Sequence, residues 1–299
     1  MKILILGIQG FIGSYLHQYF RQKNDEVYGT GSSKEQLPFY LYTDKQFTQV
    51  PAILQQQQFD VCINATGQGD VGKSIVYPAQ NFEANTSNVF VLLDAIRAYN
   101  PFCKLLNISS AAVYGNQPGT ILREDVLPRP YSPYGWHKWI SEHICTEFNQ
   151  VYGIQTCSMR LFSVYGEKQK KQLFWDLWHK CKNPGKKIIL AGSGNEERDF
   201  MYVQDVLQSV DNIIQHDAFT GGVINAGNGK PITIRHAAET FLQLVDKDIE
   251  VSFHNEIRAG DPFSLVADNK KLLSYQYQQA YSLEQGLLNY IQWLKKENL

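Results

Sequence analysis

Three polar side chains have residue types and spacing suited to acid/base chemistry at an oxygen. Tyr134 and Lys138 lie four residues apart in a segment of helical periodicity, so one turn brings both onto the same face. A tyrosine, whose ordinary pKa is about 10, works near neutral pH only if adjacent positive charge, here Lys138, lowers that pKa. Ser110 follows an apolar, strand-like run, and its hydroxyl can hold the same substrate oxygen. We therefore expect Ser110, Tyr134 and Lys138 to form a catalytic set for hydride transfer at a carbinol or keto carbon.

A glycine-rich turn near the N-terminus has the pattern of a phosphate-binding loop. An apolar run at residues 3–6 leads directly into Gly7, Gly10 and Gly13, after which apolar residues recur at helical spacing. Glycines let the turn tighten and let the backbone approach a pyrophosphate, which then faces the N–H groups of the following helix. The residues expected to bind a dinucleotide here are Gly7, Gly10, Phe11, Ile12 and Gly13.

The end of the second expected strand bears on which dinucleotide is bound. An acidic residue at this place would bind the adenosine ribose of NAD, but Ser32, Ser33 and Lys34 follow the strand and the nearby acids precede it. Small hydroxyl residues and a lysine suit a 2′-phosphate, so the sequence favours NADP(H). NAD(H) remains open, because the same three residues can also be an ordinary polar loop.

The elements that must hold these residues alternate in type. Short apolar runs alternate with segments of helical period, a pattern typical of a doubly wound α/β fold with a parallel, Rossmann-type sheet. The expected strands are residues 3–6, 26–30, 61–64, 105–108 and 155–160, and the expected helices are 11–22, 46–57, 78–99 and 134–152.

The strand–helix rhythm loosens after about residue 162, where Gly, Asn and Pro punctuate the chain. We expect a dinucleotide-binding domain over residues 1–162, joined by a returning segment at about 199–226. The rest of 163–299 is expected to form a smaller lobe that binds the substrate.

Composition excludes several other classes of protein. With 28 basic and 29 acidic residues the net charge is −1, which argues against nucleic acid or a membrane surface as the main partner. Five widely spaced cysteines without a ligand pattern argue against a disulfide framework and against a metal site. The short apolar run at the N-terminus and the lack of a 20-residue apolar stretch predict a cytoplasmic protein.

Taken together, these motifs resemble the extended short-chain dehydrogenase/reductases, the NAD(P)-dependent epimerase/dehydratase family that acts on nucleotide sugars. The resemblance covers nearly the whole chain. Besides the motifs above it rests on Val71–Ser74 followed by Pro78 and Asn85, on Arg160–Gly166, on Gly192–Gly194 with Arg198–Val206, and on Arg258–Pro262.

The resemblance implies roles for further residues. Arg198 and Arg258 would bind the diphosphate of a nucleotide sugar, as the planar fork of arginine suits phosphate oxygens. Ser74 and Ser163 would contact the substrate, and Asn85, with Lys138, would contact the cofactor. The resemblance also implies a homodimer formed through the helices expected at 78–99 and 134–152.

Departures from the family pattern narrow the reaction. Ala111 and Ala112 stand where dehydratases of the family carry acidic residues, which argues against elimination of water. Ser163 replaces the usual asparagine of its motif. The sequence favours a reductase of a nucleotide-linked 4-keto sugar, with Tyr134 as the acid. The alternative is a 4-epimerase with tightly bound NAD; a non-catalytic NADP-sensing protein is disfavoured because Tyr134 and Lys138 are both present.

Overall fold

The computed structural model describes residues 1–33, 38–182, 187–245, 249–255 and 262–298. The chain forms two compact units. The first consists of Met1–Gly115, Glu124–Leu161 and Val210–Asn225, and the second of Asn116–Arg123, Phe162–Ser209 and Ala226–Leu299.

The first unit is built on a seven-stranded sheet in the order β11-β6-β5-β4-β1-β2-β3, and the strand pairs among β1 to β6 are parallel. The central strands β1, β4, β5 and β6 are almost completely buried because both faces of the sheet are covered. This is the doubly wound, Rossmann-type α/β fold expected from the sequence. The strands are β1 Lys2–Leu6, β2 Glu26–Gly31, β3 Tyr40–Tyr42, β4 Val61–Asn64, β5 Lys104–Ser110, β6 Thr156–Leu161 and β11 Thr220–Ala226.

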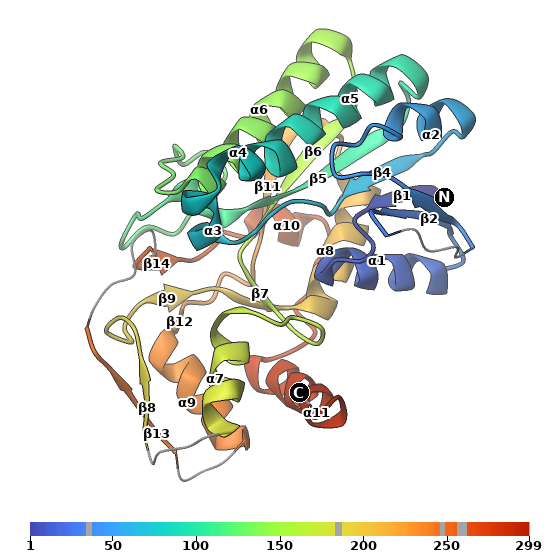
Figure 1. The fold of residues 1–299 in the computed structure, drawn as a ribbon. Helices are drawn as coiled ribbons and strands as arrows, with labels where there is room; N and C mark the ends of the chain where they lie inside the picture. The colour runs from blue at the N-terminus through green and yellow to red at the C-terminus, as the bar shows by residue number, and fades with distance from the viewer. Residues whose placement is uncertain (34–37, 183–186, 246–248, 256–261, 299) are drawn as a thin grey trace. The chain divides into compact units, whose positions relative to one another are not determined.

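Helices cover the two faces of this sheet (Figure 1). Helices α2 (Val50–Gln56), α5 (Asn88–Tyr99) and α6 (Pro133–Tyr152) bury one face, and their apolar side chains meet those of the strands in a single core. Helix α1 (Phe11–Gln22) lies on the other face, where Tyr19 donates a 2.8 Å hydrogen bond to Asp211 in the C-terminal half of α8 (Val203–His216). Core residues include Leu4, Leu6, Leu54, Leu92, Ile96, Leu105 and Phe148.

Several segments of the first unit differ from the sequence prediction, among them β3 and β11, which were not among the strands expected. The helix expected over 46–57 begins only at Val50, and a short helix, α3 (Val71–Val76), was not expected. The helix expected over 78–99 consists of α4 (Pro78–Phe82), a π-helical turn over Glu83–Ser87 and α5. Such π turns are rare and are frequent at functional sites.

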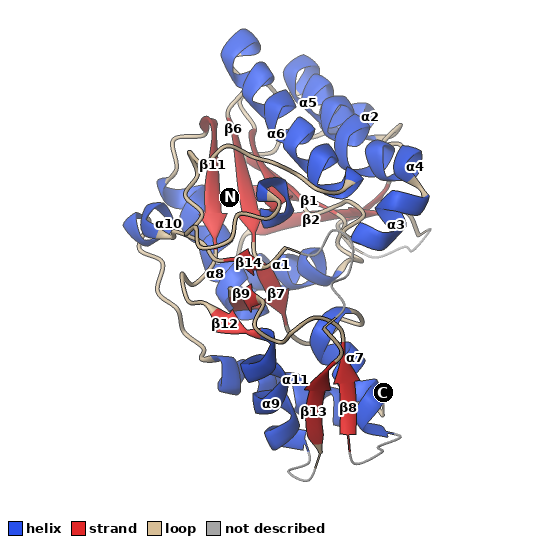
Figure 2. Ribbon diagram, turned by 90° about the vertical axis from the view of Figure 1, so that its left-hand side faces the viewer, coloured by secondary structure: helices blue, strands red, loops and turns tan. Residues whose placement is uncertain are grey.

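The second unit is made of short strands and amphipathic helices. Strand β7 pairs with β10, β9 lies between β12 and β14, and β8 pairs in parallel with β13 beside α9 (Figure 2). Aromatic rings fill its interior, among them Tyr165, Phe174, Phe200 and Phe241. The elements are β7 Ser163–Tyr165, α7 Gln172–Lys182, β8 Lys187–Leu190, β9 Glu197–Arg198, β10 Phe200–Tyr202, β12 Ile232–Thr233, α9 Ile234–Val245, β13 Glu250–Phe253, β14 Ser264–Leu265, α10 Lys270–Ser274 and α11 Leu283–Lys296.

Within the described ranges, no helix is long and apolar enough to cross a membrane. No group of His, Cys, Asp and Glu side chains in the same ranges could hold a metal ion. All five cysteines are free thiols, and four of them are buried.

Candidate active site

The expected catalytic tyrosine sits at the start of α6. Ser132 caps this helix, its hydroxyl accepting a 3.2 Å hydrogen bond from the Gly135 N–H, and Pro133 occupies the first helical position. A Cβ at Gly135 would lie 2.6 Å from the carbonyl oxygen of Ala112, so only glycine allows the helix to approach the segment after β5 this closely. The close approach brings Tyr134 to Ser110 at the carboxyl end of β5.

The Ser110 side chain lies close enough to the Tyr134 hydroxyl to affect its ionisation, and both side chains are partly exposed. Burial raises the pKa of Tyr134, and the polar contact with Ser110 lowers it by stabilising the phenolate. From the sequence, this lowering was expected to come from Lys138. In the structure the contact that lowers the Tyr134 pKa is with Ser110, and burial outweighs it.

Lys138 lies one turn further along α6 and is only 5% exposed. Its ammonium group donates a 2.8 Å hydrogen bond to the carbonyl oxygen of Ile108 in β5. Burial lowers the pKa of Lys138 to about 8, and the negative charge of Glu142 on the same helix opposes that shift. Lys138 is therefore a cation held in the protein interior at neutral pH, tied to the same strand that ends in Ser110.

The glycine turn fits the pyrophosphate of a dinucleotide. Helix α1 starts at Gly10 without a side-chain cap and without an acidic residue in its first turn, so its N–H groups are suited to an anion. A Cβ at Gly13 would lie 2.2 Å from the carbonyl oxygen of Gly7, whose φ is +88°. These positions therefore require glycine, as expected, and Phe11 and Ile12 form the first turn of α1.

The π turn carries Asn85, which was expected to contact the cofactor. The Asn85 amide nitrogen donates to the carbonyl oxygens of Asn81 and Gln68, while its buried Oδ1 accepts no hydrogen bond from the described residues. A Cβ at Gly67 would lie 2.4 Å from Asn85 Oδ1 and 3.2 Å from Lys138 Nζ. Glycine at position 67 thus allows a buried acceptor and a cation to converge beside its backbone, which fits the cofactor contact expected for Asn85 and Lys138.

The end of β2 carries a cluster of neutral hydrogen-bonding groups. Gln9 of the glycine turn donates to the Ser33 hydroxyl, and the Tyr40 hydroxyl of β3 donates to the Ser33 carbonyl oxygen at 2.7 Å. Ser32 is exposed beside them, and Lys34 lies outside the described residues. The sequence analysis named Ser32, Ser33 and Lys34 but missed Gln9 and Tyr40.

Ser74, expected to contact substrate, is fully buried in α3. Its hydroxyl donates to the carbonyl oxygen of Val71 at 2.7 Å and accepts from the N–H of Tyr134 at 3.2 Å. The structure therefore connects Ser74 to the backbone of Tyr134. The substrate contact stays a prediction.

The other expected substrate residues belong to the second unit. Ser163 begins β7, and Arg198 lies in β9, where its guanidinium donates to the carbonyl oxygens of Glu197 and Phe263. Arg198 is 8% exposed. Arg258 lies outside the described residues.

A buried ion pair next to the catalytic set was missed from the sequence. Glu142 of α6 and Arg160 of β6 are each only 4% exposed, and Arg160 Nη2 lies 2.7 Å from Glu142 Oε2. The signals were present: Glu142 follows Lys138 by one helical turn, and an arginine stands inside a strand expected to be buried.

Comparisons with known proteins agree with this geometry. Residues 3–227 match the model of the NAD dependent epimerase/dehydratase family. The chain is 26% identical over 315 residues to a putative UDP-glucose 4-epimerase of Methanocaldococcus jannaschii, and the match covers 99% of each chain.

Two solved structures are similar over nearly their full length. One is the UDP-glucuronic acid 4-epimerase of Bacillus cereus in complex with UDP-glucuronic acid and NAD, with a TM-score of 0.88, 26% identity and coverage of 99% of this chain and 100% of that one. The other is the UDP-glucose 4-epimerase of Thermus thermophilus in complex with NAD, with a TM-score of 0.85, 25% identity and coverage of 99% of each chain. The chain is therefore an enzyme of the NAD dependent epimerase/dehydratase family, as its motifs indicated.

Proposed function

We propose that the enzyme inverts C4 of the sugar in a nucleotide sugar and that it holds NAD(H) tightly while doing so. The observation that carries the proposal is the close pair of Ser110 and Tyr134, one helical turn from buried Lys138, in a chain similar over its length to 4-epimerases. The sequence favoured a reductase. The names of these relatives support the epimerase alternative instead.

The cofactor is proposed to be NAD. The two solved structures described above are complexes with NAD, and nothing in the described residues supports the NADP(H) preference inferred from the sequence. The glycine turn, Asn85 and Lys138 are the groups that would hold the dinucleotide. When bound, NAD supplies an acceptor for the hydride of C4 that can return it to either face of the sugar.

The side chains of this enzyme handle the proton and the oxygen at C4. Tyr134, as the phenolate, takes the proton of the 4-hydroxyl and gives it back after the sugar has turned. Ser110 donates a hydrogen bond to the same oxygen and keeps it within reach of Tyr134. Ser110 is the contact that favours the phenolate in the structure, and Lys138, one turn further along α6, is proposed to act chiefly on the cofactor.

Epimerisation requires fewer acid and base groups at this site than dehydration does. Loss of water requires a further acid and base near the sugar, and Ala111 and Ala112 directly after Ser110 cannot act as either. The alanines instead form a 3-10 turn, whose start is capped by the Ser110 hydroxyl accepting from the Ala112 N–H at 3.2 Å.

The nucleotide diphosphate is proposed to bind through Arg198 and Arg258 of the second unit, with Ser163 as a further contact. A guanidinium that is largely shielded from water forms strong charge-assisted bonds to phosphate oxygens. UDP is the proposed nucleotide, because UDP-sugars are named for the relatives described above.

A homodimer through α5 and α6 is also proposed. The two helices lie side by side in the first unit (Figure 1). Three large apolar side chains of these helices, Phe90, Trp136 and Tyr152, are each 47–49% exposed, and an interface would cover them. Light scattering of the enzyme and of Phe90→Glu would test this, and an unchanged monomeric mass for both would contradict it.

The experiment that tests the reaction uses the purified enzyme without added cofactor. We expect the released dinucleotide to be NAD. UDP-glucose, UDP-glucuronic acid and UDP-N-acetylglucosamine are each incubated with the enzyme, and the C4 configuration is followed by NMR together with dinucleotide absorbance. An epimerase converts one sugar to its 4-epimer with no net change in NADH. Stoichiometric consumption of NADPH by a 4-keto sugar would instead favour the reductase.

A further inference from the structure

The ion pair between Glu142 and Arg160 is held on all sides by hydrogen bonds. Glu142 Oε1 accepts from Arg160 Nε at 3.0 Å and from the Ser109 hydroxyl at 2.6 Å. Its Oε2 accepts from Arg160 Nη2 at 2.7 Å. The pair is thus bidentate and almost completely buried, a geometry in which a charge pair interacts strongly and neither partner is easily lost.

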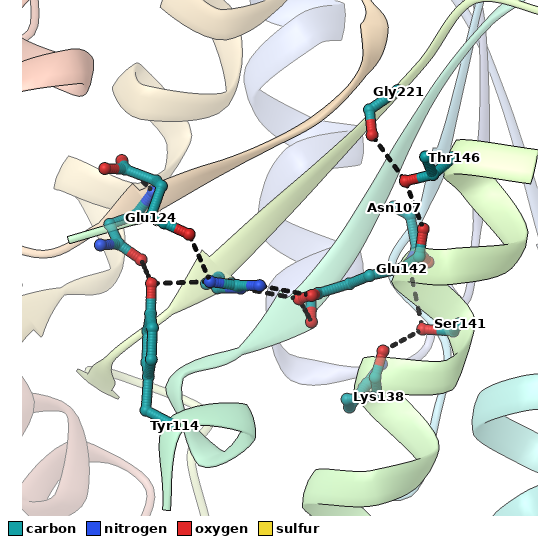
Figure 3. Close-up of polar contacts among 11 residues, drawn as sticks. Asn107, Tyr114, Glu124, Lys138, Ser141, Glu142, Thr146 and Gly221 are labelled. Carbon is teal, nitrogen blue, oxygen red and sulfur yellow. Dashed lines mark hydrogen bonds and ion pairs between the residues drawn. The ribbon is translucent and has the colours of Figure 1, made fainter. Parts of the chain in front are cut away.

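The pair joins several elements that end at the active site. Arg160 Nη1 donates to the Tyr114 hydroxyl at 2.8 Å, and Tyr114 in turn donates to Asn225 of β11 at 2.7 Å. Glu124 accepts the Asn225 N–H at 2.9 Å. Figure 3 shows how Glu142 reaches from α6 towards this group while Lys138 lies one turn below it on the same helix.

The ion pair is connected to the catalytic set through two elements, β5 and α6. Ser109, which donates to Glu142, directly precedes Ser110 in β5. Tyr134, Lys138 and Glu142 follow each other at four-residue spacing on α6, so they share one side of the helix. A change of charge at the pair therefore acts on Lys138 and Tyr134 through the protein interior, where screening by water is weak.

Few other ionisable groups compete with the pair near Lys138. In the interior of α6 and of the described elements packed against it, they are Cys145, Cys157 and Tyr114. Burial raises the pKa of both Cys145 and Tyr114, which keeps them neutral near pH 7. The charged groups of α3, the π turn and α5 are partly or fully exposed, namely Lys73, Glu83, Asp94 and Arg97.

We propose that Glu142 and Arg160 are positioning residues that act as one neutral unit, holding the end of β5 against α6 and balancing the charge felt by Lys138 and Tyr134. The inference rests on the proposed function in that Tyr134 is taken as the acid/base. It predicts opposite electrostatic effects of removing the two partners. A residue that only held the fold together would give effects of the same sign.

The signs follow from the charge that each substitution leaves behind. Glu142→Gln leaves the Arg160 cation unpaired. This cation disfavours the charged form of Lys138 and favours the phenolate of Tyr134, so it lowers the pKa of both groups. Arg160→Met leaves the Glu142 carboxylate unpaired, which raises both pKa values. The double variant carries no charge at either position, so both values should return towards those of the wild type.

The test measures the ionisation of Tyr134 directly. For each variant, tyrosinate absorbance is titrated with pH and compared with the same variant carrying Tyr134→Phe, so that the difference reports Tyr134 alone. We expect the midpoint to fall by about 0.5–1 pH unit in Glu142→Gln and to rise by a similar amount in Arg160→Met, a typical size for a nearby charge. The pH profile of turnover should move in the same directions.

Two further variants separate charge from structure. Glu147→Gln removes a carboxylate of the same kind from an exposed position of α6 and should leave the Tyr134 midpoint unchanged. Arg160→Lys keeps the charge but loses the fork that grips both oxygens of Glu142. We expect it to lower thermal stability while leaving the midpoint close to that of the wild type.

If the Tyr134 midpoint shifted in the same direction in Glu142→Gln and Arg160→Met, the proposal would be overturned. A midpoint that changed in proportion to thermal stability across all variants would also overturn it. Should Arg160→Met not fold, a midpoint in Arg160→Lys displaced as far as in Glu142→Gln would overturn it equally. The titration does not require a sugar substrate. Opposite shifts in an enzyme that fails to epimerise any sugar would leave this inference standing and count against the proposed function alone.

Discussion

Two regions of the main sheet show different ways of placing polar groups at the carboxyl ends of parallel strands. At the end of β2, Gln9, Ser33 and Tyr40 form a neutral cluster near the surface, in which no charge is buried. At the ends of β5 and β6, Glu142 and Arg160 form a buried ion pair within a network of hydrogen bonds.

The two regions differ in what can replace a hydrogen-bond or ion-pair partner that a substitution removes. Water can take the place of a partner in the neutral cluster, so a substitution there changes what is recognised at little cost in stability. The ion pair has no such replacement, because a charge left alone in the interior remains unsolvated. The residues of the neutral cluster can therefore be substituted as the ligand changes, whereas we expect substitutions of the ion pair to be poorly tolerated.

The largest expected effect is on turnover and belongs to the second region. Tyr134→Phe removes the hydroxyl that is proposed to exchange the proton, and we expect turnover to fall by about 10²–10⁴-fold. Binding of NAD should be retained, because the glycine turn is untouched. Steady-state kinetics and a dinucleotide titration check this. Near-normal turnover of the variant on its substrate would mean that the acid/base lies elsewhere.

The next prediction compares the stability of the two regions. Arg160→Met leaves a buried carboxylate without its partner and should lower the free energy of unfolding by about 3–5 kcal/mol. Gln9→Ala removes a hydrogen bond at the surface and should change it by no more than about 0.5 kcal/mol. Denaturant unfolding measures both values. Similar losses in the two variants would erase the distinction between the regions.

The third prediction concerns pH. Burial lowers the pKa of Lys138 from 10.5 to about 8, so between these values the folded state binds fewer protons than the unfolded state. Stability therefore rises with pH across that window, by at most about 3 kcal/mol. Lys138→Met should lack this rise when unfolding is compared at pH 7.5 and 9.5. Parallel curves for the variant and the wild type would show that Lys138 is not desolvated.

The smallest effect is expected on the choice of cofactor. Gln9→Arg places a guanidinium beside Ser33, where the adenosine ribose of a dinucleotide would lie, and should improve NADPH binding relative to NADH by about tenfold. Gln9→Glu is the matched control and should disfavour NADPH. Competition between the two nucleotides, followed by fluorescence, measures the ratio. An unchanged ratio in both variants would remove Gln9 from ribose recognition.

The sequence predicts the first unit well because its signals are local. The glycine turn and the period of residues 11–22 reproduce α1 to the residue, and the strand before Ser110 places that hydroxyl at the carboxyl end of β5. The sequence predicted that Ser110 and Tyr134 act on the same substrate oxygen because both motifs occur in the right order along the chain, and the structure places the two side chains close together.

What could not be predicted depends on contacts between distant residues or on very short elements. Glu142 and Arg160 meet across a helix and a strand, and neither the residue types nor their spacing specifies the pairing. The strands of the second unit are two to four residues long, too short for a period of two to be recognised. The neutral cluster at β2 depends on Tyr40 of the short strand β3, which escaped prediction for the same reason.

The π turn at Glu83–Ser87 amounts to one residue more than an α-helix would use between Asn81 and Leu92. Each residue of an α-helix turns the chain by about 100°. In a relative that lacks one residue here, this segment would be an uninterrupted α-helix. With Leu92 still in the core, the side chain of Asn81 would then point in another direction and lose its contacts with Gln68 and His137. In this segment a one-residue gap in an alignment therefore marks a change of structure at the proposed dinucleotide site, even where the flanking residues are identical.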